Sequence, residues 1–350
     1  MTGDLWNISF RKTDNQYSLR TRSSRIKLDI SDCDAVSLFS GGLDSFCGAI
    51  SLLEQGCSPC LFGHNEYPKL RAKQEKLVSM FGEEYHNQTT KFLSFTANSR
   101  APINSAGKLK GTENTSRGRS LLFLCGALTI AGILGKNVPV YIPENGFIGL
   151  NIPLTNSRKG TCSTRTTHPY FLRSFRQILN AVGISNPIIN FYEFCTKREV
   201  VNSVKNTNAF TKGYTDTISC SHPCVARYNK SGSREYPINC GYCYPCLIRK
   251  SSLLDVGPEN SEEKYTYKSV SYDLLQRLSE SNRSNDLFAV ISSIYRYQNV
   301  GDAEIKRLIM CTGTLSINDI ENYTRVYKKT MEDLIELFFQ DPKMKEYIKL

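Results

Sequence analysis

The stretch that most constrains the fold of this chain is the hexapeptide Ser40-Gly41-Gly42-Leu43-Asp44-Ser45. It follows the apolar run 35–39 and precedes a helical pattern, so it predicts a strand, a glycine turn and a helix N-terminus in succession. Adjacent glycines let backbone N–H groups approach an anion, and a helix N-terminus adds unpaired N–H groups. We therefore expect a phosphate site here, with the hydroxyls of Ser40 and Ser45 as further donors. A carboxylate repels phosphate, so Asp44 is expected to hold Mg²⁺ or to cap the helix.

A tight turn without any ligand is the simpler interpretation of the two glycines. The loop lacks the lysine of the P-loop pattern and the spacing G-x-G-x-x-G. It resembles instead the PP-loop of ATP pyrophosphatases, the nucleotide loop of N-type ATP-dependent ligases and thiolases. Members of that family cleave ATP between the α- and β-phosphates and adenylylate an oxygen of their substrate.

The composition is typical of a soluble globular protein, with 40% hydrophobic and 22% charged residues among 350. The longest uncharged apolar run, 121–134, is shorter than the roughly 20 residues that cross a bilayer, so we expect a helix buried against a sheet. Residues 1–10 carry no signal-peptide pattern, and we expect a cytoplasmic protein without a membrane partner. The net charge of +11 permits contact with nucleic acid but does not indicate it, since ATP is also anionic.

The order of apolar patterns predicts three parts of the chain. Residues 1–30 read as an N-terminal β-segment, 31–255 as alternating strands and helices, and 256–350 as a helical extension. Two polar stretches, 98–119 and 149–169, are expected as long loops. Glu144 and Asn145 end the strand predicted at 138–143, where they either touch a ligand or form an ordinary Asn-Gly turn.

Three of the thirteen cysteines are spaced as metal ligands: Cys240, Cys243 and Cys246. An upstream thiol, Cys220 or Cys224, could complete a set of four. Four thiolates are typical of structural zinc, which we favour over an iron–sulfur cluster or redox thiols.

Together the glycine loop and the cysteine run resemble the 7-cyano-7-deazaguanine synthase (QueC-like) family of PP-loop enzymes. The resemblance covers about 33–255, and the cysteine run matches it in the extended form Cys240-Gly241-x-Cys243-x-x-Cys246-x-x-Arg249. Three further motifs carry it: Arg117-Gly118-Arg119-Ser120 before an apolar helix, Thr196-Lys197-Arg198-Glu199-Val200-Val201, and Thr217-Ile218-Ser219-Cys220. The family has an R-N pair where this chain has Arg119-Ser120, and its Y-G-Q-x-H-like stretch is not recognisable at 63–67. On this match Cys220, rather than Cys224, is the first zinc ligand.

The resemblance implies both a fold and a reaction. The fold is a PP-loop parallel sheet with flanking helices, and the cofactors are ATP, Mg²⁺ and a structural Zn²⁺. The reaction activates a 7-deazaguanine carboxylate with ATP and transfers it to ammonia, giving an amide and then a nitrile. Asp44, Arg119 and Lys197 would be catalytic, the last two carrying charge that develops in the transition state.

The departures from the family pattern leave the acceptor open. The N-terminal segment, the basic loops and the helical extension suggest a divergent branch, similar to members found in bacterial antiviral defence operons. An amine on a protein partner is then a second candidate acceptor. Two other classes of function also fit the sequence: a tRNA-modifying PP-loop thiolase or ligase, and a non-catalytic nucleotide-binding partner.

Overall fold

The computed structural model describes residues 29–96, 103–104, 107–108, 119–154, 167–228, 235–256 and 265–349. All but the last two residues of the predicted N-terminal β-segment at 1–30, and most of the two predicted loops, lie outside these residues. Within the predicted loop 98–119, a short antiparallel pair forms from β4 (Ile103–Asn104) and β5 (Gly107–Lys108).

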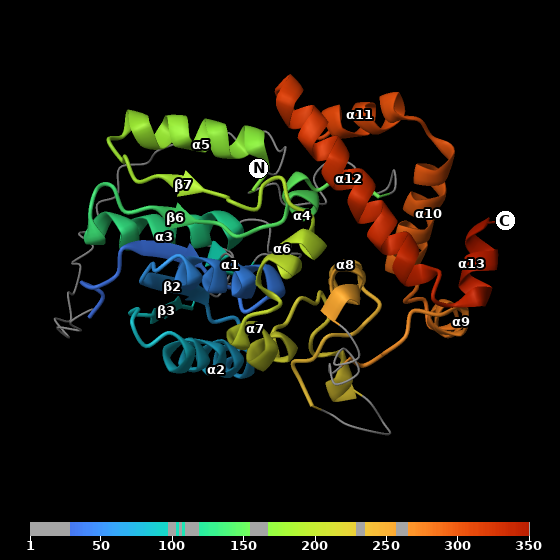
Figure 1. Cartoon of the computed structure of the whole chain (residues 1–350), viewed down its shortest axis with the longest axis horizontal. Helices are drawn as coiled ribbons and strands as arrows, with labels where there is room; N and C mark the ends of the chain where they lie inside the picture. The colour runs from blue at the N-terminus through green and yellow to red at the C-terminus, as the bar shows by residue number, and fades with distance from the viewer. Residues whose placement is uncertain are drawn as a thin grey trace.

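A five-stranded parallel sheet forms the centre of the α/β part of the molecule, in the order β3-β2-β1-β6-β7 (Figure 1). Its strands are β1 (Ala35–Leu38), β2 (Pro59–His64), β3 (Lys91–Phe95), β6 (Val140–Tyr141) and β7 (Ile188–Ile189). Val36 pairs with Cys60 on one side and with Val140 on the other. The strand order therefore reverses between β1 and β6, and ligands of open parallel sheets bind at such a reversal, beyond the carboxyl ends of the strands.

Helices cover both faces of the sheet (Figure 1). Helices α1 (Leu43–Glu54), α2 (Pro68–Glu84), α6 (Lys197–Val204) and α7 (Asn208–Gly213) share one hydrophobic core. Helices α3 (Arg119–Leu134) and α5 (Pro169–Ala181) share the core of the opposite face. The predicted burial of 121–134 holds for only one side of α3, because Leu122 and Ile133 remain 48% and 61% exposed.

The helical extension packs beside the sheet and consists of α9 (Tyr272–Glu280), α10 (Asn285–Asn299), α11 (Asp302–Met310), α12 (Ile317–Phe338) and α13 (Pro342–Lys349) (Figure 1). Its buried side chains form a single hydrophobic core with α4 (Gly146–Leu150) and α8 (Tyr244–Ser252). Helices on both sides of the predicted boundary at residue 255 therefore pack in the same hydrophobic core. Within the part of the chain that the structure describes, no helix combines the length and apolar character needed to cross a membrane.

Candidate functional site

The glycine loop turns sharply between β1 and α1. Gly41 has φ +80°, a conformation that side chains with a Cβ rarely adopt, and a Cβ there would lie 3.0 Å from Gln74 Cγ. Gly42 takes the N-cap position of α1, and the Ser45 hydroxyl donates to its carbonyl at 2.9 Å. The predicted succession of strand, glycine turn and helix is confirmed.

Two distant segments hold the loop in this conformation. The Gln74 side-chain amide donates to the Ser40 carbonyl at 3.0 Å, and the Ile218 N–H donates to the Gly41 carbonyl at 2.9 Å. The Leu43 N–H donates to Ser219 Oγ at 3.0 Å. Ser219 belongs to the Thr217–Cys220 motif, but no sequence pattern indicated that Gln74 would contact the loop.

Asp44 is buried in the first turn of α1, and its two carboxylate oxygens differ in environment. Oδ2 accepts hydrogen bonds from Lys197 Nζ at 2.8 Å and from Asn145 Nδ2 at 3.0 Å. Oδ1 is buried and has no hydrogen-bond partner among the described residues. Asp44 does not cap α1, because the N-cap position is held by Gly42 and Asp44 lies within the first turn of the helix. Of the two roles expected for Asp44, the structure therefore excludes helix capping.

Glu144 and Asn145 reach Asp44 from the end of β6, on the other side of the reversal in strand order. Asn145 caps α4 by accepting the Ile148 N–H at 3.1 Å, while its amide nitrogen donates to Asp44. Burial, and then the negative charge of Asp44, raise the pKa of Glu144 to about 8, although Lys197 opposes the shift. A carboxylate pair with one uncompensated negative charge is suited to binding a cation or a shared proton.

We expect Glu144 to make the protein less stable as the pH rises from about 4.5 to about 8 in the absence of Mg²⁺. The unfolded state releases the Glu144 proton near pH 4.5, whereas the folded state retains it up to about pH 8. The unfolded state therefore binds fewer protons in this window, and the free energy of unfolding falls. Urea unfolding of the wild type and of Glu144→Gln across this window isolates the effect, because glutamine does not titrate. A difference between the two proteins that is independent of pH would contradict the raised pKa.

Arg119 pairs with a carboxylate outside this group, that of Glu66. It begins α3, and its Nη1 donates to Glu66 at 2.7 Å beyond the end of β2. The two side chains are 45% and 51% exposed. Among the described residues no ion pair joins Arg119 to Asp44, so of the three predicted catalytic residues the structure brings together only Asp44 and Lys197.

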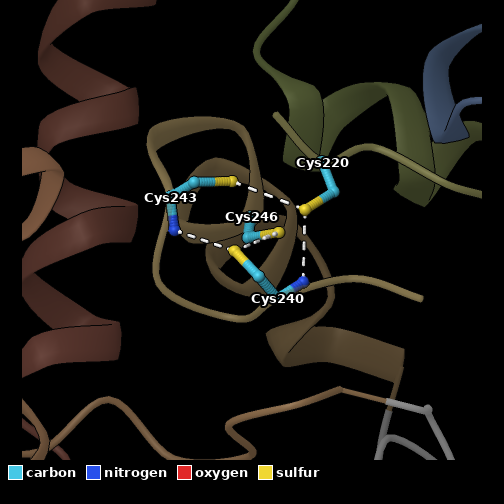
Figure 2. A group of neighbouring side chains, drawn as sticks. All are labelled: Cys220, Cys240, Cys243 and Cys246. Atoms are coloured by element: carbon cyan, nitrogen blue, oxygen red, sulfur yellow. Dashed lines mark hydrogen bonds between the residues drawn. The ribbon is translucent and has the colours of Figure 1, made fainter. Parts of the chain in front are cut away.

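The second constellation gathers four thiols whose Sγ atoms all lie within 4.8 Å of one another: Cys220, Cys240, Cys243 and Cys246 (Figure 2). Cys220 Sγ lies 3.8 Å from Cys243 Sγ, and Cys240 Sγ lies 3.9 Å from Cys246 Sγ. Four sulfurs at about 2.3 Å from a tetrahedral zinc are about 3.8 Å apart, so the spacing fits Zn²⁺. The predicted four-cysteine cluster is confirmed, with Cys220 rather than Cys224 as the fourth thiol.

The surroundings shift the pKa values of the four thiols in both directions, since the hydrogen bond with Cys240 raises the pKa of Cys220 and burial raises the pKa of Cys246. Backbone N–H groups of His222 and Cys240 both donate to Cys220 Sγ at 3.2 Å. The hydrogen bond with Cys220 lowers the pKa of Cys240 to about 6. Hydrogen bonds to Cys240 and Cys243 raise the pKa of His222 to about 10, so its imidazolium offsets negative charge that a single Zn²⁺ leaves uncancelled.

The cluster and the glycine loop are joined by one short segment, Thr217–Cys220. Buried Arg249 donates to Thr217 Oγ1 at 2.6 Å, and the Asn239 side-chain oxygen accepts the Ser219 N–H at 2.9 Å. Ser219 in turn holds Leu43, and Cys220 belongs to the thiol cluster. A metal that fixes Cys220 therefore also fixes the segment on which the loop rests.

Comparison with protein families and curated proteins found no relative of this chain. No protein-family model matches the chain, and a search of curated proteins gave no match.

Proposed function

We propose that this chain is a PP-loop enzyme of the 7-cyano-7-deazaguanine synthase (QueC-like) family that uses ATP to adenylylate the carboxylate of a 7-deazaguanine. The observation that carries the proposal is the setting of Asp44. It directly follows the glycine turn, in the first turn of α1, at the point where the strand order reverses. Lys197 and Asn145 donate to one carboxylate oxygen, and the other accepts no hydrogen bond from the described residues. A glycine turn with only a structural role has no need of this group of charges.

The chemistry calls for ATP because a carboxylate is a poor acyl donor. Its leaving group would be oxide, whereas an acyl-adenylate releases AMP. In the proposed reaction a carboxylate oxygen attacks the α-phosphorus of ATP, and the bond to pyrophosphate breaks. Ammonia then displaces AMP to give the amide, and a second adenylylation, at the amide oxygen, followed by loss of AMP and a proton gives the nitrile.

The glycine loop would bind the departing pyrophosphate. In this loop Ser40 is exposed and Gly42 is half-buried, so the turn is open to solvent at these two residues. The Gly42 N–H is held by Ser40 Oγ at 3.2 Å and the Leu43 N–H by Ser219 Oγ at 3.0 Å. Phosphate oxygens can replace these hydroxyls as acceptors, and the dipole of α1 favours the anion.

The Lys197 ammonium group would supply positive charge beside the reacting phosphate. Its side chain is only 7% exposed, so its charge acts with less screening than on the surface. Asn145 donates to the same Asp44 oxygen as Lys197, through an amide that is itself fixed by capping α4. Preorganised charges of this kind lower the cost of charge developing in a transition state.

The residues present also fit Mg²⁺, which prefers oxygen ligands. Asp44 Oδ1 is a buried oxygen that accepts no hydrogen bond from the described residues, and Glu144 is near enough to Asp44 for its pKa to be raised by that charge. Asp44 and Glu144 would hold the ion, and a bound Mg²⁺ would neutralise charge on the phosphates.

Further polar atoms, at the last residue of β2 and the residue after it, favour binding of a nucleotide base. His64 Nε2 and Asn65 Oδ1 are buried and have no hydrogen-bond partner among the described residues. The His64 ring lies 4.9 Å from that of Phe95, so an aromatic surface accompanies these atoms. A purine offers both a flat ring and complementary hydrogen-bonding groups.

The thiol cluster supports a structural rather than a catalytic role. Cys240, Cys243 and Cys246 are buried, and zinc bound by four thiolates has no open position for a substrate. An RNA-thiolating enzyme would need accessible cysteines, so the burial of these three favours the ligase chemistry.

The proposal is tested by incubating the protein with ATP, Mg²⁺, ammonium and 7-carboxy-7-deazaguanine. We expect liquid chromatography–mass spectrometry to detect AMP and pyrophosphate together with the amide or the nitrile. Formation of AMP without a deazaguanine product would keep the PP-loop chemistry and exclude this substrate. Absence of ATP turnover and of ATP binding would contradict the proposal and favour a non-catalytic role.

A further inference from the structure

The first turn of α6 directs consecutive side chains to different neighbours. Lys197 donates to Asp44 in the candidate site at 2.8 Å. Arg198 and Glu199 instead contact α12 of the helical extension, more than a hundred residues further along the chain. The residue assigned to the reaction is therefore adjacent in sequence to two residues that bind the extension.

Arg198 lies among three carboxylates. Its Nε donates to Asp255 at 2.7 Å, and its Nη1 donates to Asp333 at 3.0 Å and to Glu336 at 2.5 Å. The side chains of Arg198 and Asp333 are only 17% and 15% exposed, so solvent screens this group less than an ordinary surface pair. The guanidinium, and the backbone that carries it, are held against α12.

Glu199 also binds the first turn of α6 to α12, but here the carboxylate lies on α6 and the cations lie on α12. Its Oε1 accepts from Arg325 Nη1 at 2.7 Å and from Lys329 Nζ at 3.1 Å. Its Oε2 accepts the Thr196 N–H at 2.8 Å, and Thr196 caps α6 in return, which completes a capping box. One side chain thus joins the N-terminus of α6 to α12.

Helix α12 also contacts the segments on either side of the site. The ring of Tyr327 lies 6.0 Å from that of Phe147 in α4, whose N-cap is Asn145. The ring of Tyr323 lies 5.2 Å from that of Phe194, just before α6. The segments that carry Asn145 and Lys197 therefore pack on one helix of the extension.

We propose that α12 is a positioning helix for the nucleotide site, and that its ion pairs with Arg198 and Glu199 hold the Lys197 ammonium group on Asp44. The extension is then part of the catalytic apparatus, and a molecule that displaces α12 would change turnover without touching ATP. This inference rests on the proposed function, because it assigns a role within the same site.

The test is a double-mutant cycle between the α12 carboxylates and Lys197. Asp333→Asn together with Glu336→Gln is expected to lower kcat for ATP turnover about 10- to 100-fold, as small displacements of catalytic groups do. In the Lys197→Ala background the same pair of substitutions should have little further effect, because its influence passes through Lys197. Independent, multiplying effects would overturn the proposal.

Two more variants separate positioning from folding. Glu199→Gln keeps a side chain that can complete the capping box but removes the charge that binds Arg325 and Lys329, and it should also lower kcat. Asp302→Asn breaks the ion pair between Asp302 of α11 and Lys328 of α12, and it should leave kcat unchanged. Equal losses in both variants would indicate a general effect on stability and overturn the proposal.

Hydrogen exchange provides a readout that does not depend on activity. Amides of 197–204 should exchange faster in the Asp333→Asn/Glu336→Gln protein than in the wild type, and unchanged exchange would overturn the proposal. A wild type without ATP turnover would contradict the proposed function, and exchange would then still decide whether α12 holds α6. If the wild type turns over ATP and the Asp333→Asn/Glu336→Gln variant has the same kcat, the positioning role is overturned and the proposed function is not.

Discussion

Replacing Asp44 with asparagine is expected to lower AMP and pyrophosphate formation about 100- to 1000-fold, the range typical for loss of a group that stabilises transition-state charge. Asparagine preserves the shape of the side chain but removes the charge that would hold Mg²⁺. Steady-state production of pyrophosphate with saturating ATP measures the effect. Asp273→Asn, which breaks an exposed ion pair with Lys343 in the extension, is the control and should retain full turnover.

The same substitution also leaves Lys197 buried without its partner, which introduces a second effect. Removing one member of a buried ion pair costs about 3–5 kcal/mol of stability. The side chains of Lys197 and Asp44 are 7% and 11% exposed, so we expect a lower unfolding midpoint for Asp44→Asn. Adding Lys197→Met should recover part of the stability but none of the turnover. Recovery of turnover along with stability would show that Asp44 has a structural role only.

Replacing Cys243 with alanine is expected to release the metal and to abolish ATP binding. In small zinc-binding peptides a structural zinc contributes about 10–16 kcal/mol, as large as the whole stability of a typical domain. Cys243 is buried in the hydrophobic core of the extension, and the cluster fixes the Thr217–Cys220 segment on which the glycine loop rests. Metal content by mass spectrometry, the unfolding midpoint and ATP affinity should all fall together.

Cys224→Ala is the matched control for this prediction. Cys224 is half-buried and near Cys220 in sequence but is not part of the four-thiol cluster. It should keep one zinc per chain and normal ATP affinity. Loss of zinc from the Cys224 variant, or its retention by the Cys243 variant, would contradict the assignment of ligands.

The local features of the fold could be predicted from the sequence because each depends on neighbouring residues. The apolar run 35–39 and the helical pattern after the glycines located β1 and α1 on the two sides of the glycine loop. The spacing of Cys240, Cys243 and Cys246 located the thiol cluster. The fourth thiol came from the family resemblance, since spacing alone left Cys220 and Cys224 open.

The contacts that complete the site could not be predicted, because they join residues far apart in the chain. Asn145 donates to Asp44 across 101 residues and Lys197 across 153, and the Asn-Gly pattern at Asn145 equally fits an ordinary turn. Gln74 carries no motif, yet it holds the loop. The role of α12 depends on packing and charge between α6 and the extension, which neither segment reveals by itself.

An oxygen-transfer measurement tests the central claim most directly. The protein is incubated with ATP, Mg²⁺, ammonium and 7-carboxy-7-deazaguanine labelled with ¹⁸O in its carboxylate, and the AMP is analysed by mass spectrometry. Adenylylation of the carboxylate predicts AMP that carries one ¹⁸O atom from the substrate. Unlabelled AMP, or ADP in its place, would contradict the account.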